Sequence, residues 1–155
     1  MDILLKKFKD KINHIENSNA YIVDLNSWKD ISEFIKNDER MLFDYLKCIS
    51  AYDLGESKIF GVAYNFYSTK LKQYLEVRIE VDDSQEIESI AHLWRSADWH
   101  EREAYDMIGV KFKNHPDMKR ILLPEDWEGY PLRKDYKTPE YYNGMPVPKD
   151  KSYWE

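Results

Sequence analysis

The chain contains a single cysteine among 155 residues. One thiol cannot form an internal disulfide, and it cannot hold a metal by itself. Iron–sulfur clusters need several cysteine thiolates, so this sequence offers no site for one. Cys48 lies in an apolar, strand-like run, where a free cysteine usually behaves as a small buried hydrophobe. We therefore predict that Cys48 has a packing role.

Long apolar runs are also missing. Nowhere do about 18 apolar residues follow one another, so no membrane span is predicted. Lysines and Asp10 interrupt the first apolar positions, which excludes the core of a secretory signal. We therefore expect a soluble, intracellular protein.

Positive charge is in deficit. The 23 Lys and Arg residues stand against 29 Asp and Glu residues, which leaves a net charge of -6. This is the wrong sign for a general nucleic-acid binder, which must neutralise phosphates. We therefore expect no nucleic-acid partner.

Proline is absent from the first 115 positions, and all six prolines lie at or after Pro116. Because proline fixes φ and removes a backbone donor, we predict a folded domain over 1–115 and an extended segment over 116–155. Residues 129–155 contain four prolines, five tyrosines and Trp154, which is too aromatic for an ordinary solvated tail. We expect this proline- and tyrosine-rich C-terminal segment to lie across another protein.

Apolar periodicity predicts the order of helices and strands. Residues 75–81 alternate apolar and charged side chains, as in a strand with one buried face. Clustered strands and segregated helices indicate an α+β fold, with a small antiparallel-rich or mixed sheet covered by helices. The predicted elements are a helix over 2–16, a strand over 21–25, a helix over 28–38, strands over 42–53, 59–67 and 73–81, a helix over 83–94 and a helix over 98–108 that stops at Gly109.

Signatures of catalysis are scarce. The chain has no glycine-rich phosphate cradle and no evident nucleophile beside a base. His100 and Glu101 begin like a zinc-protease motif, but Ala104 stands where the second histidine is needed. His115 has no second histidine or cysteine nearby, so we expect a structural histidine and no metal site.

Charges concentrate in the last predicted helix. Successive helical residues turn by about 100°, so Glu101, Arg102 and Glu103 point in three directions and form no carboxylate pair. Arg102 can bond Asp106 along the helix, and His100 can bond Glu103, but such exposed pairs contribute only about 0.3 to 0.5 kcal/mol. The favoured interpretation is that these charges anchor a subunit or interdomain contact, where desolvated bonds are stronger.

Three stretches, 101–109, 115–122 and 129–136, occur in a fixed order that resembles the signature of the C-type subunit of the NADH:quinone oxidoreductase family, respiratory complex I. The resemblance extends more loosely over 42–100 and is weakest over 1–40. Arg133 suits bidentate carboxylate recognition, which favours an interface there. The motif residues taken as candidate interface residues are Glu101, Arg102, Glu103, Tyr105, Asp106, Gly109, His115, Pro116, Arg120, Leu122, Gly129, Pro131, Leu132, Arg133, Lys134, Asp135 and Tyr136.

The resemblance implies a non-catalytic scaffold subunit in the peripheral, quinone-reducing arm of a complex I-like enzyme. In that family electrons pass from NADH through FMN and iron–sulfur clusters on other subunits to quinone, and this drives proton translocation. It further implies contact with the D-type quinone-site subunit and with the adjacent B- and I-type iron–sulfur subunits. The hetero-oligomer would lie at the cytoplasmic face of the membrane. No catalytic, cofactor-binding or metal-binding residue is expected in this chain.

Other functions remain open at this stage. The chain ends at Glu155, whereas many family members carry a longer C-terminal extension, so the host could be a related membrane-bound hydrogenase or a quinone oxidoreductase with another electron donor. A second alternative is a freestanding hydrolase that uses Glu101 or Glu103 as acid or base, which needs a paired carboxylate in a cleft. A third is a binding module with dissociable partners.

Overall fold

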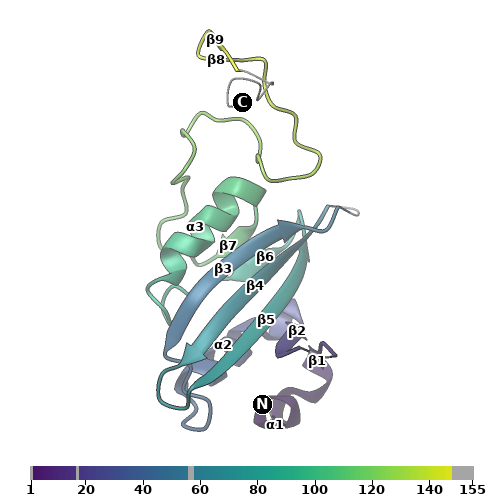
Figure 1. Cartoon of the computed structure of the whole chain (residues 1–155), viewed down its shortest axis with the longest axis vertical. Coiled ribbons are helices and arrows are strands. Elements are labelled where there is room, and N and C mark those ends of the chain that lie inside the picture. The colour runs from purple at the N-terminus through teal and green to yellow at the C-terminus, as the bar shows by residue number, and fades with distance from the viewer. Residues whose placement is uncertain (1, 17, 56–57, 148–155) are drawn as a thin grey trace, which may run out of the picture.

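A five-stranded mixed sheet with helices on one face forms the body of the chain (Figure 1). The structure is a computed structural model that describes residues 2–16, 18–55 and 58–147. The strand order is β1-β2-β5-β4-β3, and only the β2–β5 pairing is parallel. The predicted α+β class with a mixed sheet is confirmed. The strands are β1 (Ile12–His14), β2 (Ala20–Val23), β3 (Tyr45–Asp53), β4 (Ile59–Ser68) and β5 (Gln73–Asp82).

Strands β3, β4 and β5 form the antiparallel meander that the sequence predicts. Phe66 is paired with Leu75 and Tyr64 with Val77, so the apolar residues of both strands share one face. All four of these side chains are buried. The alternation over 75–81 thus identifies the core-facing side of the sheet correctly. The first strand of the meander, β3, begins at Tyr45 and not at 42 as predicted.

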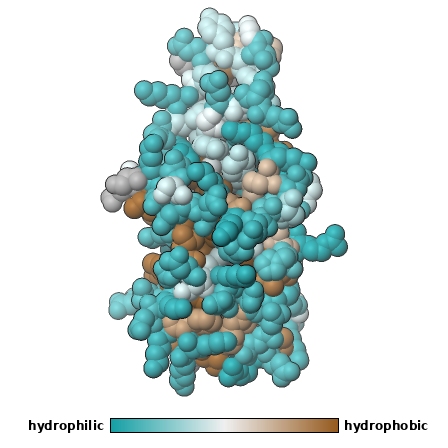
Figure 2. Space-filling view, turned by 180° about the vertical axis from the view of Figure 1, so that it is seen from behind, coloured by the Kyte–Doolittle hydropathy of each residue, from teal (hydrophilic) through white to brown (hydrophobic). Residues whose placement is uncertain are grey.

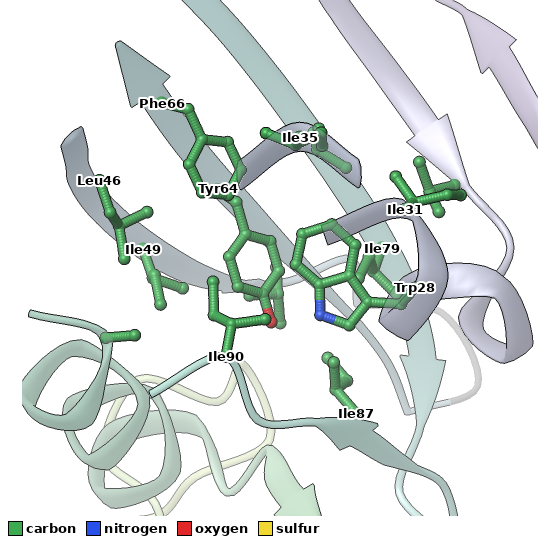
Figure 3. Close-up of a cluster of buried hydrophobic side chains, with 14 of the residues drawn as sticks. Trp28, Ile31, Ile35, Leu46, Ile49, Tyr64, Phe66, Ile79, Ile87 and Ile90 are labelled. Carbon is green, nitrogen blue, oxygen red and sulfur yellow. The ribbon is translucent and has the colours of Figure 1, made fainter. Parts of the chain in front are cut away.

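Helices α2 (Trp28–Asn37) and α3 (Ala97–Ile108) contribute buried side chains to the core, as predicted. Trp28, at the start of α2, is fully buried, and its ring lies 4.5 Å from that of Tyr64 in the sheet. Figure 3 shows this pair with Ile31 and Ile35 of α2 and with Ile87 and Ile90 beneath the two rings. Large aromatic side chains in such a layer bury about 150 to 250 Å² each as a rule, so they carry much of its stabilisation.

The helix predicted over 2–16 is wrong in its second half. Helix α1 (Asp2–Phe8) and a 3-10 turn η1 (Lys9–Lys11) are followed by strand β1. Ile12 fits the apolar stripe of a helix, but in the structure it pairs with Val23 at the sheet edge. A second 3-10 turn, η2 (Leu25–Ser27), precedes α2.

The helix predicted over 83–94 is also wrong. Residues Glu86–Glu88 form strand β6, which pairs in parallel with β7 (Lys111–Lys113), and turns follow up to Trp94. Ile87 lies opposite Phe112 in this pair. The apolar residues at helical spacing therefore lie in a strand and a turn. They do so because β7, a segment distant in sequence, pairs with β6.

Cys48 lies in β3, as predicted, but it is half-buried and not enclosed. A β-bulge between Leu46 and Cys48 shifts the register, so Cys48 pairs with Asn65 on the face of the sheet opposite the core. Exposed tyrosines, including Tyr45 and Tyr74, lie on the same face. The buried position expected for Cys48 is therefore wrong, and its packing role stays a prediction.

Residues 114–147 contain turns, bends and a short hairpin of β8 (Tyr141–Tyr142) and β9 (Met145–Pro146). Figure 1 shows this part of the chain running past α3 and carrying the hairpin to the end of the molecule opposite α1. The predicted boundary between 1–115 and 116–155 stays a prediction, and residues 148–155, with Trp154, lie outside the described residues. Among the described residues, no helix combines the length and apolar character needed to cross a membrane.

Candidate functional site

Helix α3 carries three charged side chains that are buried. Glu101, Arg102 and Asp106 are enclosed, whereas Glu103 is exposed and Tyr105 is half-buried. Gly109 ends the helix in the left-handed conformation with φ 84°, as predicted for a C-terminal glycine. The three buried charges find their partners outside the helix.

Glu101 faces away from solvent toward the segment after β6. One carboxylate oxygen accepts a hydrogen bond from the Ser89 hydroxyl at 2.6 Å, and the other accepts one from the Ile90 N–H at 2.9 Å. Burial raises the pKa of Glu101 to about 7, although both hydrogen bonds act in the opposite direction. This carboxylate therefore exchanges its proton near neutral pH.

His115 closes the same cluster. Its Nε2 lies 3.2 Å from the Asp98 carbonyl oxygen, 3.3 Å from an Asp98 carboxylate oxygen and 3.8 Å from Glu101. Its Nδ1 accepts a hydrogen bond from the Asp117 N–H at 3.1 Å, so the neutral ring carries its proton on Nε2. The imidazole thus connects α3 to the first turn of the C-terminal segment.

Asp106 organises the next part of that segment. One carboxylate oxygen accepts hydrogen bonds from the successive N–H groups of Ile121, Leu122 and Leu123, at 3.0, 2.7 and 3.0 Å. The other oxygen pairs with Arg120 at 2.7 Å. Burial alone would raise the pKa of Asp106, but these bonds outweigh it and lower the pKa. The carboxylate is therefore held ionised in the interior.

Arg120 extends the network from Asp106. Its second terminal nitrogen donates to the carbonyls of Trp127 and Gly129, at 3.1 and 3.0 Å, and its guanidinium lies 5.3 Å from the Tyr130 ring. One side chain thus fixes the path of the chain from its own position to Tyr130.

Arg133 makes the second attachment. It lies between the rings of Phe60 and Tyr130, 4.5 Å from each centroid, and donates to the Ile108 carbonyl at 2.5 Å and to Asp83 at 2.8 Å. The Lys134 N–H donates to Asp53 at 2.8 Å, and this bond lowers the pKa of Asp53. Within this chain Arg133 therefore bonds a carbonyl and a single carboxylate oxygen, and not a carboxylate through both arms of its fork.

The bond between Arg102 and Asp106 that the spacing allows is not formed. Arg102 donates from Nε to the Lys119 carbonyl at 3.1 Å, because Asp106 is occupied by Arg120 and by backbone donors. The described residues likewise show no bond between His100 and Glu103. The helix surface therefore does not hold the charge pairs expected from sequence spacing alone.

Together these contacts define an attachment network that ties residues 115–134 to the α+β domain. Asp53, Asp83, Ser89 and Asp98 belong to it but were missed from sequence, because their partners lie 12 to 81 positions away. Of the predicted residues, the structure brings Glu101, Arg102, Asp106, Gly109, His115, Arg120, Gly129, Arg133 and Lys134 into the network, and Tyr136 joins it through a bond from Trp127. Glu103, Pro116, Leu122, Leu132 and Asp135 have exposed side chains, and Tyr105 and Pro131 are half-buried.

Apolar side chains of the attached segment point the other way. Leu122 is 61% exposed and Leu132 is 60% exposed, while Tyr141 and Met145 of the hairpin are also exposed. Figure 2 shows the side opposite the view of Figure 1 as a largely hydrophilic surface interrupted by apolar areas. The segment therefore binds the domain through polar groups while two of its leucines, Leu122 and Leu132, stay exposed.

The buried carboxylates of α3 do not form the acid pair in a cleft that a hydrolase needs. A cavity of about 160 Å³ between α3 and β3 is lined by Glu103, Ala104, Met107 and Leu132, but Glu101 does not reach it. No group of three or more His, Cys, Asp or Glu side chains in the described part of the chain is arranged to hold a metal ion.

The family model for the 30 kDa subunit of respiratory-chain NADH dehydrogenase matches residues 21–142, which include most of this network. The chain belongs to this family. It is 43% identical over 153 residues to the C-type subunit of NADH-quinone oxidoreductase from Chloroherpeton thalassium, covering 94% of this chain and 63% of the relative. It is 39% identical over 153 residues to the same subunit from Chlorobium phaeobacteroides, covering 95% of this chain and 92% of the relative. The resemblance found from the motif is thereby confirmed.

Two further similarities extend the comparison. The J-type subunit of NAD(P)H-quinone oxidoreductase from Prochlorococcus marinus is 43% identical over 125 residues, covering 76% of this chain and 70% of the relative. A chain in the structure of the membrane-bound sulfane sulfur reductase, an archaeal respiratory membrane complex, has a TM-score of 0.73 at 19% identity, covering 88% of this chain and 82% of the other. The second similarity shows a shared fold.

Proposed function

We propose that the chain is a non-catalytic scaffold subunit in the peripheral, quinone-reducing arm of a complex I-like NADH:quinone oxidoreductase. Its family consists of subunits of such assemblies, and its own residues form neither a metal site in the described ranges nor a paired carboxylate at the cavity beside α3. FMN, iron–sulfur clusters, NADH and quinone would be bound by other subunits. The chain would support electron transfer to quinone by holding these subunits in position.

The observation that carries the proposal is the orientation of the attached segment. Soluble chains usually turn apolar groups inward, but here polar groups bind the domain while Leu122 and Leu132 face outward. Aromatic and apolar residues exposed on a fixed backbone are typical of the centre of a protein interface. We propose that this outer surface and the rest of 116–155 contact the D-type quinone-site subunit and the adjacent B- and I-type subunits at the cytoplasmic face of the membrane.

The test is gentle membrane solubilisation, affinity purification through this chain and identification of the associated polypeptides. We expect an NADH-binding flavoprotein together with the quinone-site and iron–sulfur subunits, and NADH-dependent quinone reduction by the recovered assembly but not by the isolated chain. Recovery of the chain alone, or turnover by the isolated chain that Glu103→Gln abolishes, would contradict the proposal.

A related host is the alternative, because the same fold occurs in a chain of a sulfane sulfur reductase membrane complex. In that case the purified assembly would contain a hydrogenase-like or other donor-specific subunit in place of the NADH-binding flavoprotein. A binding module would instead release its partners during dilution. The same purification therefore separates the three possibilities.

A further inference from the structure

Arg102 is a buried guanidinium whose charge is not neutralised within the described residues. The residue is only 8% exposed, and its one hydrogen bond there is from Nε to the Lys119 carbonyl. No carboxylate in the described ranges pairs with it. Asp117 is close enough to feel its charge, but the Asp117 carboxylate bonds Lys119 at 2.7 Å. A mostly buried guanidinium without an ion-pair partner offers a binding site for an anion from outside the chain.

The two terminal nitrogens of Arg102 remain open to the surface. Neither donates a bond in the described part of the chain, and neither is among the fully enclosed unpaired atoms, which are Nε1 of Trp28, the hydroxyl of Tyr64 and one oxygen of Asp98. Nη1 and Nη2 form a planar fork that matches the two oxygens of a carboxylate.

An exposed aromatic ring lies beside this fork. The Arg102 guanidinium lies 5.2 Å from the ring of Trp99, which is 61% exposed. The segment passes beside α3 so that Lys119 meets Arg102 and Leu122 meets Asp106 one helical turn further on, which places the exposed Leu122 along the same helix face. Tryptophan and arginine are among the residues that most often dominate binding in protein interfaces.

We propose that Arg102 receives an aspartate or glutamate side chain of a partner protein, with both carboxylate oxygens bonded to Nη1 and Nη2 and with apolar partner residues against Trp99 and Leu122. This deepens the proposed function, since it rests on the chain having a stable protein partner. It identifies the centre of the contact and the chemistry of the residue that enters it.

The first test replaces Arg102 with Gln in the full chain and measures the amount recovered with the host assembly. Leaving the partner carboxylate buried and unpaired should reduce recovery at least about tenfold. Arg102→Lys should also reduce it several-fold, because one ammonium cannot bond both oxygens. Arg95→Gln removes an exposed positive charge nearby and should leave recovery within twofold. Equal recovery of the Arg102 and Arg95 variants would overturn the proposal.

A second measurement does not depend on a variant of Arg102 folding. A photoreactive amino acid in place of Trp99, with Arg102 intact, should crosslink to a partner peptide that has Asp or Glu within a few residues of the attachment point. Changing that acid to Arg should lower recovery, and Arg102→Glu should restore it. Crosslinks only to peptides without an acid would overturn the proposal. Wild-type chain recovered without partners would instead contradict the proposed function itself.

Discussion

Two buried carboxylates in α3, less than two helical turns apart, have pKa values shifted in opposite directions. Asp106 receives three backbone N–H groups and a guanidinium, so its pKa is lowered despite burial. Glu101 receives one hydroxyl and one N–H, so burial prevails and its pKa rises to about 7. The donors around Asp106 outweigh the effect of its burial, whereas those around Glu101 do not.

Asp106→Asn should destabilise the protein by about 3 to 5 kcal/mol, because it leaves Arg120 partly buried without its anion and weakens the hold on three N–H groups. Urea unfolding followed by tryptophan fluorescence would measure the loss. Asp117→Asn, which breaks an exposed pair with Lys119, should leave the midpoint unchanged. Similar midpoints for both variants would show that the Asp106 network contributes little.

Glu101→Gln should change how stability depends on pH. The folded-state pKa of Glu101 is about 7, above the ordinary value of 4.5, so the folded protein keeps a proton that the unfolded chain loses. The carboxyl therefore stabilises the fold most below pH 4.5, and this contribution is lost as pH rises to about 7, on the order of 3 kcal/mol in total. Glu103, an exposed neighbour on the same helix, is the position of the control variant.

The experiment is a series of unfolding curves between pH 4.5 and about 8 for the wild type, Glu101→Gln and Glu103→Gln. The slope between pH 4.5 and about 7 should disappear in the first variant alone. A wild-type curve that does not differ from the Glu101→Gln curve would show that Glu101 ionises at ordinary pH. Sequence spacing identified these side chains, but it could not show that Arg102 and Asp106 bond to residues 14 to 17 positions away instead of to each other.

At the scale of elements, the predicted helices and strands are correct where the apolar period of a segment agrees with the tertiary contacts that it makes. The strands over 45–82 and the helices α2 and α3 have a consistent period and are confirmed. The failures, in 9–16 and 83–94, are short segments whose apolar residues suit a helix. Strand β1 pairs with the next strand, β2, and β6 pairs with β7 beyond α3, and such pairing outweighs local propensity.

The end of α3 is determined by what packs against it. Gly109 has φ 84°, and a Cβ there would lie 2.5 Å from Nη2 of Arg133 and 2.6 Å from the Tyr130 ring. The glycine therefore serves the backbone turn and the close approach of the attached segment at once. The sequence predicts the turn, but the approach of Arg133 depends on tertiary structure.

Gly109→Ala should loosen the attachment of the segment. The left-handed conformation alone costs about 1 to 2 kcal/mol for alanine, and the displaced Arg133 and Tyr130 add to it. Limited trypsin digestion of the native protein should therefore cleave after Arg133 or Lys134 at least about tenfold faster. Gly144→Ala, with φ 77° but no atom within 4 Å of the added Cβ, is the matched control and should leave that cleavage rate unchanged. Equal rates would mean that Arg133 is not held by this contact.

Considered as a whole, the molecule has a core-bearing domain, a segment that runs past α3 and a hairpin at the end opposite α1 (Figure 1). Residues 115–134 are held by bonds within the chain, while the contact of residues 129–155 with another protein stays a prediction. Sequence motifs identified these residues as a unit. They could not show whether the unit binds its own domain or another protein, because the same charges suit both.

Changing the outward leucines tests the role of this surface. Leu122→Ser and Leu132→Ser together should leave the thermal midpoint of the isolated chain within about 2 °C, because both side chains are exposed. Recovery with the host assembly should fall at least about tenfold. Tyr45→Ser removes a similarly exposed side chain from the sheet face opposite the core and should have no effect on recovery. Normal recovery of the double leucine variant would place the contact elsewhere.

The three N–H groups gathered by Asp106 have a further consequence for assembly. A stretch of backbone immobilised before any encounter has little freedom left to lose when a neighbour arrives, so more of the contact energy is available as affinity. The docking shape is then present from the moment the chain folds, and a matching protein can recognise it in one step without waiting for a loop to find its conformation.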